Sequence, residues 1–403
     1  MAYVPPFSAL DFHSTVFSLV FKSPIEWDPE KRRVVFTPSR RATPIWTVIA
    51  IGCEICLLQV LCGYLLISEF WWPEKSTLSS SQVMFQVIIV LLSAVQGVIA
   101  YIFWIYWDDW KFAFGQFVWL LERLERRYAP YPQKPGSYSS IILIFKLADI
   151  FVTLAIFLFT PMAVVLNIDP FHHILTQLSP YYTAQVSLHV WIGATFRVPL
   201  CILMMLDVAR VFIYIGIMFV IACKIWLRYF YLIEEPYRVH MLPRHTKLRD
   251  AIATYREVLV QLKVFHCPLT TLSTLMTFII SVSVIIANFL AVRMHQLLPA
   301  VVLYVIIPGF LVGALWLPYH ILPDCGDFTT ISEELIRKWR LRAGSNLDGW
   351  KKKRFEKVLR SLPVCYFKFG LGEYVFINIS RATKGMYQKV IVDNTISALL
   401  FNW

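Results

Sequence analysis

The sequence is poor in charged residues, which excludes one large class of proteins at once. Only 16% of its 403 residues are charged, whereas 58% are hydrophobic, and the mean hydropathy is +0.60. A soluble domain of ordinary composition carries about 25% charged residues. This composition therefore argues against a soluble globular protein and predicts a polytopic membrane protein embedded in a lipid bilayer.

The sequence also lacks the motifs on which common enzyme classes depend. It has no P-loop, no G-x-S-x-G, no H-E-x-x-H and no protein-kinase signature. His240 and His245 are isolated, and no set of carboxylates or cysteines completes a tetrahedral zinc site with the adjacent His172 and His173. We therefore expect no catalytic activity, no metal and no cofactor.

Seven apolar segments reach the roughly 20 residues that a helix needs to cross a bilayer. They cover residues 45–68, 83–107, 139–166, 198–223, 272–292, 299–321 and about 373–403. No secretory signal precedes them, so the first span is expected to act as its own insertion signal. The predicted fold is all-α, with an N-terminal arm (1–44), six helices that form a ligand-binding bundle and have cytoplasmic helical extensions (45–321), a basic anchor segment (322–372) and a last helix (373–403).

Positive charge is distributed very unevenly between the two sets of loops. Alternate connecting segments carry thirty Lys and Arg residues on one side and two on the other, and residues 167–196 carry none. Basic loops stay in the cytoplasm. The expected orientation has a cytoplasmic N-terminus and an extracellular C-terminus. The formal net charge of +12 is then explained by loops lying against an anionic inner leaflet, so nucleic acid is not an expected partner.

The last predicted span, residues 373–403, contains more polar residues than is usual for a membrane span. Arg381, Gln388, Thr395 and Asn402 are seven residues apart, a spacing that keeps side chains on one slowly drifting stripe of a helix. A helix that runs from Arg381 to Asn402 is about 31 Å long, close to the thickness of the hydrocarbon core of a bilayer. The stripe fits a water-filled path, and it equally fits hydrogen bonding to neighbouring helices.

Several other charged residues lie within predicted spans. Glu54 is near the middle of the first span, where an ionised carboxylate is costly unless it is paired or hydrated, so it is a functional candidate. Lys146 with Asp149, and Asp207 with Arg210, are spaced i, i+3 and are expected to neutralise each other locally as structural pairs.

A mostly apolar ligand pocket with a few polar contacts is expected in the outer half of the bundle. The loop at 167–190 lacks Lys and Arg but is rich in histidine and tyrosine, which favours an aromatic, polar rim. The candidate pocket residues from the spans around it are Phe159, Trp191, Arg197, Asn288 and Tyr304.

The end of the chain resembles the signature region of the insect gustatory receptor family, part of the insect chemoreceptor superfamily. That family has a stretch like G-x-F-x-I-N-R, then T-Y, five mostly apolar residues and Q-F. The positions that match the first stretch are Gly372, Phe376, Ile377, Asn378 and Arg381. The positions that correspond to the second are Thr395, Ile396, residues 397–401, Asn402 and Trp403, with Ile, Asn and Trp standing for Tyr, Gln and Phe.

This resemblance implies a ligand-gated, non-selective cation channel in the plasma membrane. The channel would be built from four identical or related subunits around a central pore lined by the last helix of each, and a small-molecule tastant would open it. Gln388, Thr395 and Asn402 would then contact water and ions, with Leu399 or Trp403 as an apolar gate near the outer end.

Two other classes of seven-span protein were weighed against the channel. A G-protein-coupled receptor would place its amino terminus outside, which the loop charges oppose. An ion-coupled secondary transporter could use Glu54, Asp207 and Arg210, although the two halves of the sequence show no internal repeat.

Overall fold

The computed structural model gives the fold of most of the chain. It describes residues 7–18, 20–31, 33–37, 44–71, 80–106, 108–112, 116, 119, 123, 126, 139–165, 169, 171–172, 175, 188–234, 244–293, 295–296, 302–346 and 349–400. Every structural statement below refers to these residues.

Helices make up most of the described chain, and each predicted span contains one. They are α1 (Phe7–Phe17), α2 (Pro44–Thr47), the π-helix η1 (Val48–Cys62), α3 (Gly63–Trp71), α4 (Ser80–Ile105), α6 (Ser139–Val165), α9 (Leu188–Glu234), α10 (Arg244–Arg293), the π-helix η4 (Val302–Ile306), α11 (Ile307–Asn346), α12 (Gly349–Arg360) and α13 (Thr383–Leu400). Two antiparallel hairpins, β1 (Ile25–Asp28) with β2 (Arg33–Phe36) and β3 (Lys368–Leu371) with β4 (Tyr374–Asn378), correct the all-α expectation to a mostly helical fold.

Four of the described helices are long and apolar enough to cross a membrane. Their ranges are Ile141–Val165, Thr195–Glu234, Arg249–Arg293 and Leu303–Leu341. The last three are 39 to 45 residues long, well beyond the roughly 20 that a bilayer requires, so a large part of each extends past any membrane. The continuous helix α11 also runs straight through residue 321, where the predicted bundle and anchor segments meet.

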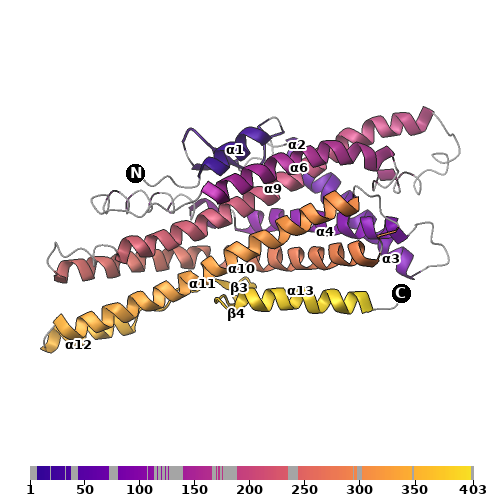
Figure 1. Ribbon diagram of the computed structural model, residues 1–403. Coiled ribbons are helices and arrows are strands. Elements are labelled where there is room, and N and C mark those ends of the chain that lie inside the picture. The colour runs from indigo at the N-terminus through magenta and orange to yellow at the C-terminus, as the bar shows by residue number, and fades with distance from the viewer. Residues whose placement is uncertain are drawn as a thin grey trace.

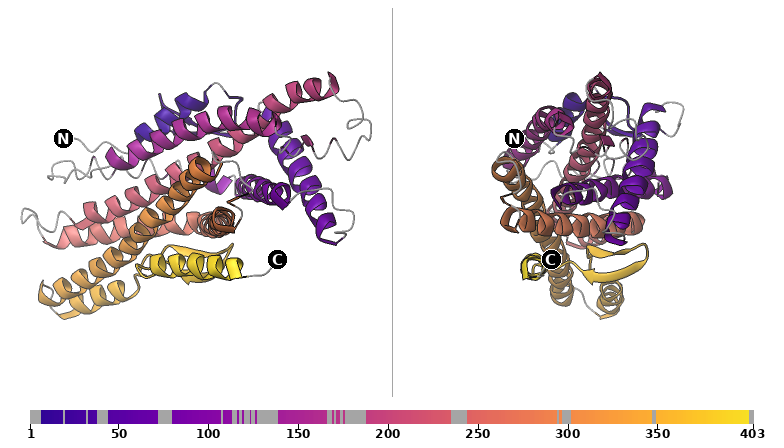
Figure 2. Two further views of the ribbon diagram at one scale, coloured as in Figure 1. Left: turned by 45° about the vertical axis from the view of Figure 1, so that its right-hand side comes forward. Right: turned by 90° about the vertical axis from the view of Figure 1, so that its right-hand side faces the viewer.

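The long helices α6, α9 and α11 run lengthwise through the molecule (Figure 1). The C-terminal parts of α9 and α11 and the N-terminal part of α10 lie together with α12 at one end of the molecule, which we call the α12 end. The helices η1, α3 and α4 lie towards the opposite end. α13 lies along the outside of α10 and α11, at the edge of the molecule in both views of Figure 2.

The largest hydrophobic core extends from the N-terminal arm to the α12 end. Its largest fully buried side chains include Trp226, Tyr229, Phe328 and Trp339. The hydroxyl of Tyr255 donates to the carbonyl of Pro363 at 2.8 Å, and it lies 2.7 Å from the hydroxyl of Ser332. The Ser332 hydroxyl also accepts the backbone N–H of Cys365 at 3.0 Å. These contacts tie the segment after α12 to α10 and α11.

The N-terminal arm is a folded part of the molecule. α1 packs on α6 and α9, and β1 packs on α1; Phe7, Leu10 and Trp27 of this arm belong to the main core. Nδ1 of the buried His13 lies 2.9 Å from Oδ1 of Asp149 on α6. The predicted pair of Lys146 with Asp149 is therefore replaced by a contact between residues 136 positions apart, and the Lys146 ammonium lies 5.5 Å from the ring centre of Phe12.

The predicted last helix starts later than the sequence indicated. Residues 373–378 belong to the β3–β4 hairpin and its turn, so the expectation of a helix from residue 373 is wrong. Gly372 has a φ of +60°, a left-handed conformation that favours glycine. A side chain at Gly370 would collide with the carbonyl oxygen of Tyr374. These two glycines allow the tight turn of the hairpin, and the helix begins only at Thr383.

Candidate functional site

α13 rests on α10 and α11 through one narrow face. Its inward side chains recur every three or four residues, at Tyr387, Ile391, Thr395, Ala398 and Leu399. Ile391 packs with Val284 of α10 and Ala314 of α11. This spacing leaves most of the helix circumference free of contact within the single chain, because only Thr383 and Ile391 of α13 are buried.

The outward face of α13 mixes apolar and charged side chains. Val392 and Ile396 are 53% and 50% exposed, and the exposed Lys389 and Asp393 lie beside them. Lipid alone would suit the valine and isoleucine but impose a large cost on the two charged groups. Water alone would leave the apolar side chains uncovered. This face therefore needs both a polar medium and an apolar neighbour.

The structure separates the residues predicted to line a pore. Gln388 is exposed, whereas Thr395 and Leu399 are half-buried on the face of α13 that contacts α10 and α11. Asn402 and Trp403 lie outside the described residues. In the terminal motif, Ile396 is on the exposed face and Thr395 on the packed one. The predicted stripe is also interrupted at its start, because Arg381 precedes the helix.

Two of the basic residues near α13 turn towards α11. Nε of Arg381 lies 2.6 Å from Oδ1 of Asp327, and the Lys384 ammonium lies 3.2 Å from the ring centre of Tyr319. A side chain at Gly326 would lie 2.7 Å from the backbone nitrogen of Arg381, so α11 and the turn before α13 approach closely. The N-terminal end of α13 is thus held to α11 by the ion pair, by the cation–π contact and by backbone packing.

Three of the five predicted ligand residues have separate surroundings. Arg197 is buried on α9, and Tyr304 on η4 is 74% exposed. Asn288 on α10 donates from Nδ2 to Oγ1 of Thr395 at 3.4 Å. Phe159 is half-buried on α6, and the side chain of Trp191 lies outside the described part of α9. The described contacts do not bring these residues around one common cavity.

Asp169 is a residue that the sequence analysis overlooked. Its Oδ2 accepts a 2.7 Å hydrogen bond from Nη1 of Arg197, and its Oδ1 accepts the backbone N–H of His172 at 3.0 Å. Burial raises the pKa of the Asp169 carboxyl, while the Arg197 guanidinium acts in the opposite direction. Asp169 is the carboxylate nearest in sequence to His172 and His173. It could have been identified as the partner of Arg197, because a buried arginine needs a carboxylate nearby.

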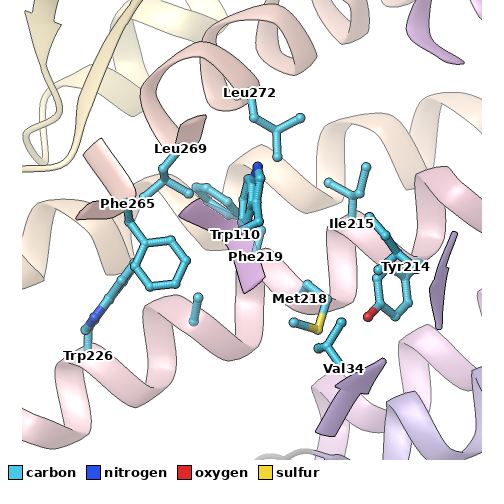
Figure 3. A pocket seen from close by; sticks show the side chains of 12 residues that line it. Val34, Trp110, Tyr214, Ile215, Met218, Phe219, Trp226, Phe265, Leu269 and Leu272 are labelled. Atoms are coloured by element: carbon cyan, nitrogen blue, oxygen red, sulfur yellow. The ribbon is translucent and has the colours of Figure 1, made fainter. Parts of the chain in front are cut away.

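A small apolar cavity lies between the N-terminal hairpin, α9 and α10 (Figure 3). The rings of Trp226 and Trp110 both meet Phe265 edge-on, with centroids 5.5 and 5.8 Å from it, and Tyr214, Met218 and Val34 lie on the opposite side. Its volume is 30 Å³, room for about two water molecules, whereas ligand pockets measure roughly 300–1,000 Å³. We interpret it as a packing cavity.

Comparisons with known proteins find similarity in structure alone. No family model matches the chain, and no curated protein matches its sequence significantly. The solved structure of the insect olfactory receptor OR5 from Machilis hrabei is similar, with a TM-score of 0.54 and 13% identity, covering 98% of this chain and 97% of that chain. The same receptor in complex with eugenol has a TM-score of 0.50 and 11% identity, with 98% of each chain covered. The chain therefore shares its fold, over nearly its whole length, with an insect olfactory receptor.

Proposed function

We propose that this protein is a chemosensory receptor of the gustatory type, acting as a ligand-gated, non-selective cation channel in the plasma membrane. The observation that carries the proposal is α13, an 18-residue helix held to its own chain by one face only, with charged and apolar side chains on the other. Such a face fits a helix that meets other subunits and a water-filled pore. The fold shared with an olfactory receptor supports this assignment.

Seven membrane crossings follow from this proposal. The four long apolar helices account for four of them, and α2–η1–α3, α4 and α13 supply the others. The loop charges favour a cytoplasmic amino terminus and an extracellular carboxyl terminus. The α12 end, with residues 322–372, then forms a cytoplasmic anchor, and residues 1–44 form a cytoplasmic arm.

The pore would be formed by four subunits, identical or related, with their last helices around one axis. Gln388 is the predicted pore residue whose side chain is already exposed, and the exposed Asp393 would add a cation-attracting carboxylate. Thr395, Leu399, Asn402 and Trp403 complete the proposed lining and gate. Arg381 and Lys384 are engaged with α11, which removes two of the basic groups that would oppose cation passage.

The ligand would be a small organic molecule bound among Phe159, Trp191, Arg197, Asn288 and Tyr304. The eugenol complex of the olfactory receptor supports the size and chemistry of such a ligand. Asn288 is the residue that links ligand and pore in this proposal, because it already donates a hydrogen bond to Thr395 of α13. A ligand that competes for this amide would change the equilibrium between two positions of α13.

The proposal is tested by expressing the chain alone and together with related receptor subunits, and recording currents with a panel of small organic molecules that includes eugenol. Ligand-evoked cation currents with single-channel steps support it. Substrate uptake into vesicles without unitary currents supports the transporter instead. A carboxyl-terminal epitope that antibodies reach on intact cells supports the orientation, and an epitope reached only after permeabilisation contradicts it.

A further inference from the structure

Glu54 is a buried carboxylate without a hydrogen-bond partner. It lies on the π-helix η1 with 0% of its surface exposed. Neither of its two carboxylate oxygens has a hydrogen-bond partner among the described residues. A buried carboxyl group in this condition is costly in either protonation state, because the ion lacks a counter-charge and the neutral acid lacks an acceptor for its hydroxyl. π-Helical turns are rare and occur frequently at functional sites.

A second carboxylate and an arginine lie close to Glu54. η1 contacts α9, and Ile49 and Cys53 of η1 belong to the same buried cluster as Met204 of α9, which lies one turn before Asp207. The charges of these two residues act on Glu54. Asp207 and Arg210 are themselves buried, with 0% and 7% of their surfaces exposed.

Arg210 is already engaged by groups other than Glu54. Its Nη2 donates to Oδ1 of Asp207 at 2.5 Å, and its Nη1 donates to the carbonyl oxygen of Phe21 in the N-terminal arm at 2.6 Å. The guanidinium carbon also lies 5.0 Å from the ring centre of Phe21. The sequence-based expectation of an Asp207–Arg210 pair is thus confirmed, and the buried Nε of Arg210 has no hydrogen-bond partner among the described residues.

The cluster therefore contains two carboxylates and one guanidinium. With both acids ionised its net charge is −1, inside a segment that we place in the membrane. One bound monovalent cation would neutralise the cluster, whereas a divalent ion would leave it with a net charge of +1. The surrounding Ile49, Cys53, Leu58 and Met204 provide an apolar shell that strengthens the attraction for a cation.

We propose that Glu54 and Asp207 form a binding site for one small monovalent cation inside each subunit. The bound cation joins η1 to α9, and Arg210 extends this link to the N-terminal arm through Phe21. The site is separate from α13 and does not depend on the chain being a channel, because its occupancy is measured as binding and not as current.

The test uses the purified full-length protein in nanodiscs. Thermal unfolding is followed by tryptophan fluorescence in NaCl, KCl, methylammonium chloride and N-methyl-D-glucamine chloride at one ionic strength. The first three salts supply a small cation and the fourth does not. Comparing sodium and potassium with methylammonium also distinguishes a site for an inorganic ion from a site for an ammonium group. We expect at least one small cation to raise the unfolding midpoint of the native chain by a few degrees. The same shift is expected to be absent in Glu54→Gln and kept in Glu333→Gln, a matched exchange at an exposed residue of α11.

The proposal is overturned if no small cation raises the midpoint above that in N-methyl-D-glucamine, or if Glu54→Gln keeps the full shift. If Glu54→Gln does not fold, radiolabelled sodium binding to the native chain decides the question, with potassium and methylammonium as competitors. Saturable binding of one sodium ion per chain supports the site. Displacement of the bound sodium by a competitor that also raises the unfolding midpoint supports it as well. Absence of both binding and stabilisation refutes it.

Discussion

The amide of Asn288 on α10 donates a hydrogen bond to the hydroxyl of Thr395 on α13, with an N–O distance of 3.4 Å. This contact joins a residue from the proposed ligand set to a residue from the proposed pore helix, although the two are 107 positions apart in the sequence. It is a direct polar contact between the two proposed sites.

We expect Thr395→Val, which keeps the side-chain shape but removes the acceptor, to lower the free energy of unfolding by about 0.5–1 kcal/mol. Asn288→Leu should have a similar effect, and the double variant should cost less than the sum of the two. A double-mutant cycle on ligand-evoked current measures the same coupling as a shift in half-maximal ligand concentration. Strict additivity in both measurements would show that the bond has no part in gating.

The close approach of α11 to the turn before α13 predicts a contrast between two glycines of one helix. Gly326→Ala should destabilise the protein by about 1–3 kcal/mol, because its Cβ would lie 2.7 Å from the Arg381 backbone nitrogen. Gly313→Ala is the matched control, since nothing lies within 4 Å of its Cβ, and it should be neutral or stabilising. The measurement is the thermal unfolding midpoint of each variant in the same lipid. Equal effects at the two glycines would contradict the packing described here.

The buried contact between His13 and Asp149 predicts that the N-terminal arm can be released selectively. His13→Ala leaves Asp149 without this contact inside the fold, which should cost about 1–3 kcal/mol and expose the arm. Limited proteolysis should cut residues 7–37 faster in this variant, with Glu30→Gln, an exposed change in the same arm, cut at the native rate. An unchanged cleavage rate in His13→Ala would mean that the apolar contacts of α1 hold the arm alone.

The sequence was informative about helices and poor at contacts between distant residues. Hydropathy located a helix within each predicted span, because a long apolar run has few other structures in a membrane. The β3–β4 hairpin was missed, because residues 368–372 were counted as part of the basic anchor segment and residues 373–378 as part of the last span. The His13–Asp149 contact was also missed, because local i, i+3 spacing pointed to Lys146 and no local pattern records a partner 136 residues away.

The candidate site was predictable only in outline. The polar character of the last helix was visible in the sequence, but the face that packs on α10 and α11 depends on tertiary contacts. Thr395 and Leu399 proved to lie on that face, and Gln388 beside it. The Asp169–Arg197 pair depends in the same way on the approach of a loop to a helix.

Burial of the Cys365 thiol predicts an alkaline loss of stability. Burial raises its pKa from 9.0 to about 11 in the folded chain, with the hydrogen bonds to Tyr255 and Ser332 acting in the opposite direction. A raised pKa in the folded state means that the contribution to stability is complete below about pH 9 and is lost as the pH rises through about 11. Cys365→Ala should therefore show a smaller fall in unfolding midpoint between pH 8.5 and 11 than the native chain. An identical pH profile in the two proteins would contradict this role.

The most direct test of the central claim is the reaction of single cysteines with a water-soluble, charged thiol reagent during current recording. Gln388→Cys and Asp393→Cys should react and change the ligand-evoked current, because their side chains would border water in the proposed channel. Phe278→Cys is the control, since Phe278 is an exposed apolar residue of α10 and should face lipid without reacting. Modification at positions 388 and 393 with none at 278 is the predicted result, and unreactive cysteines at both α13 positions, with ligand present, would contradict the account.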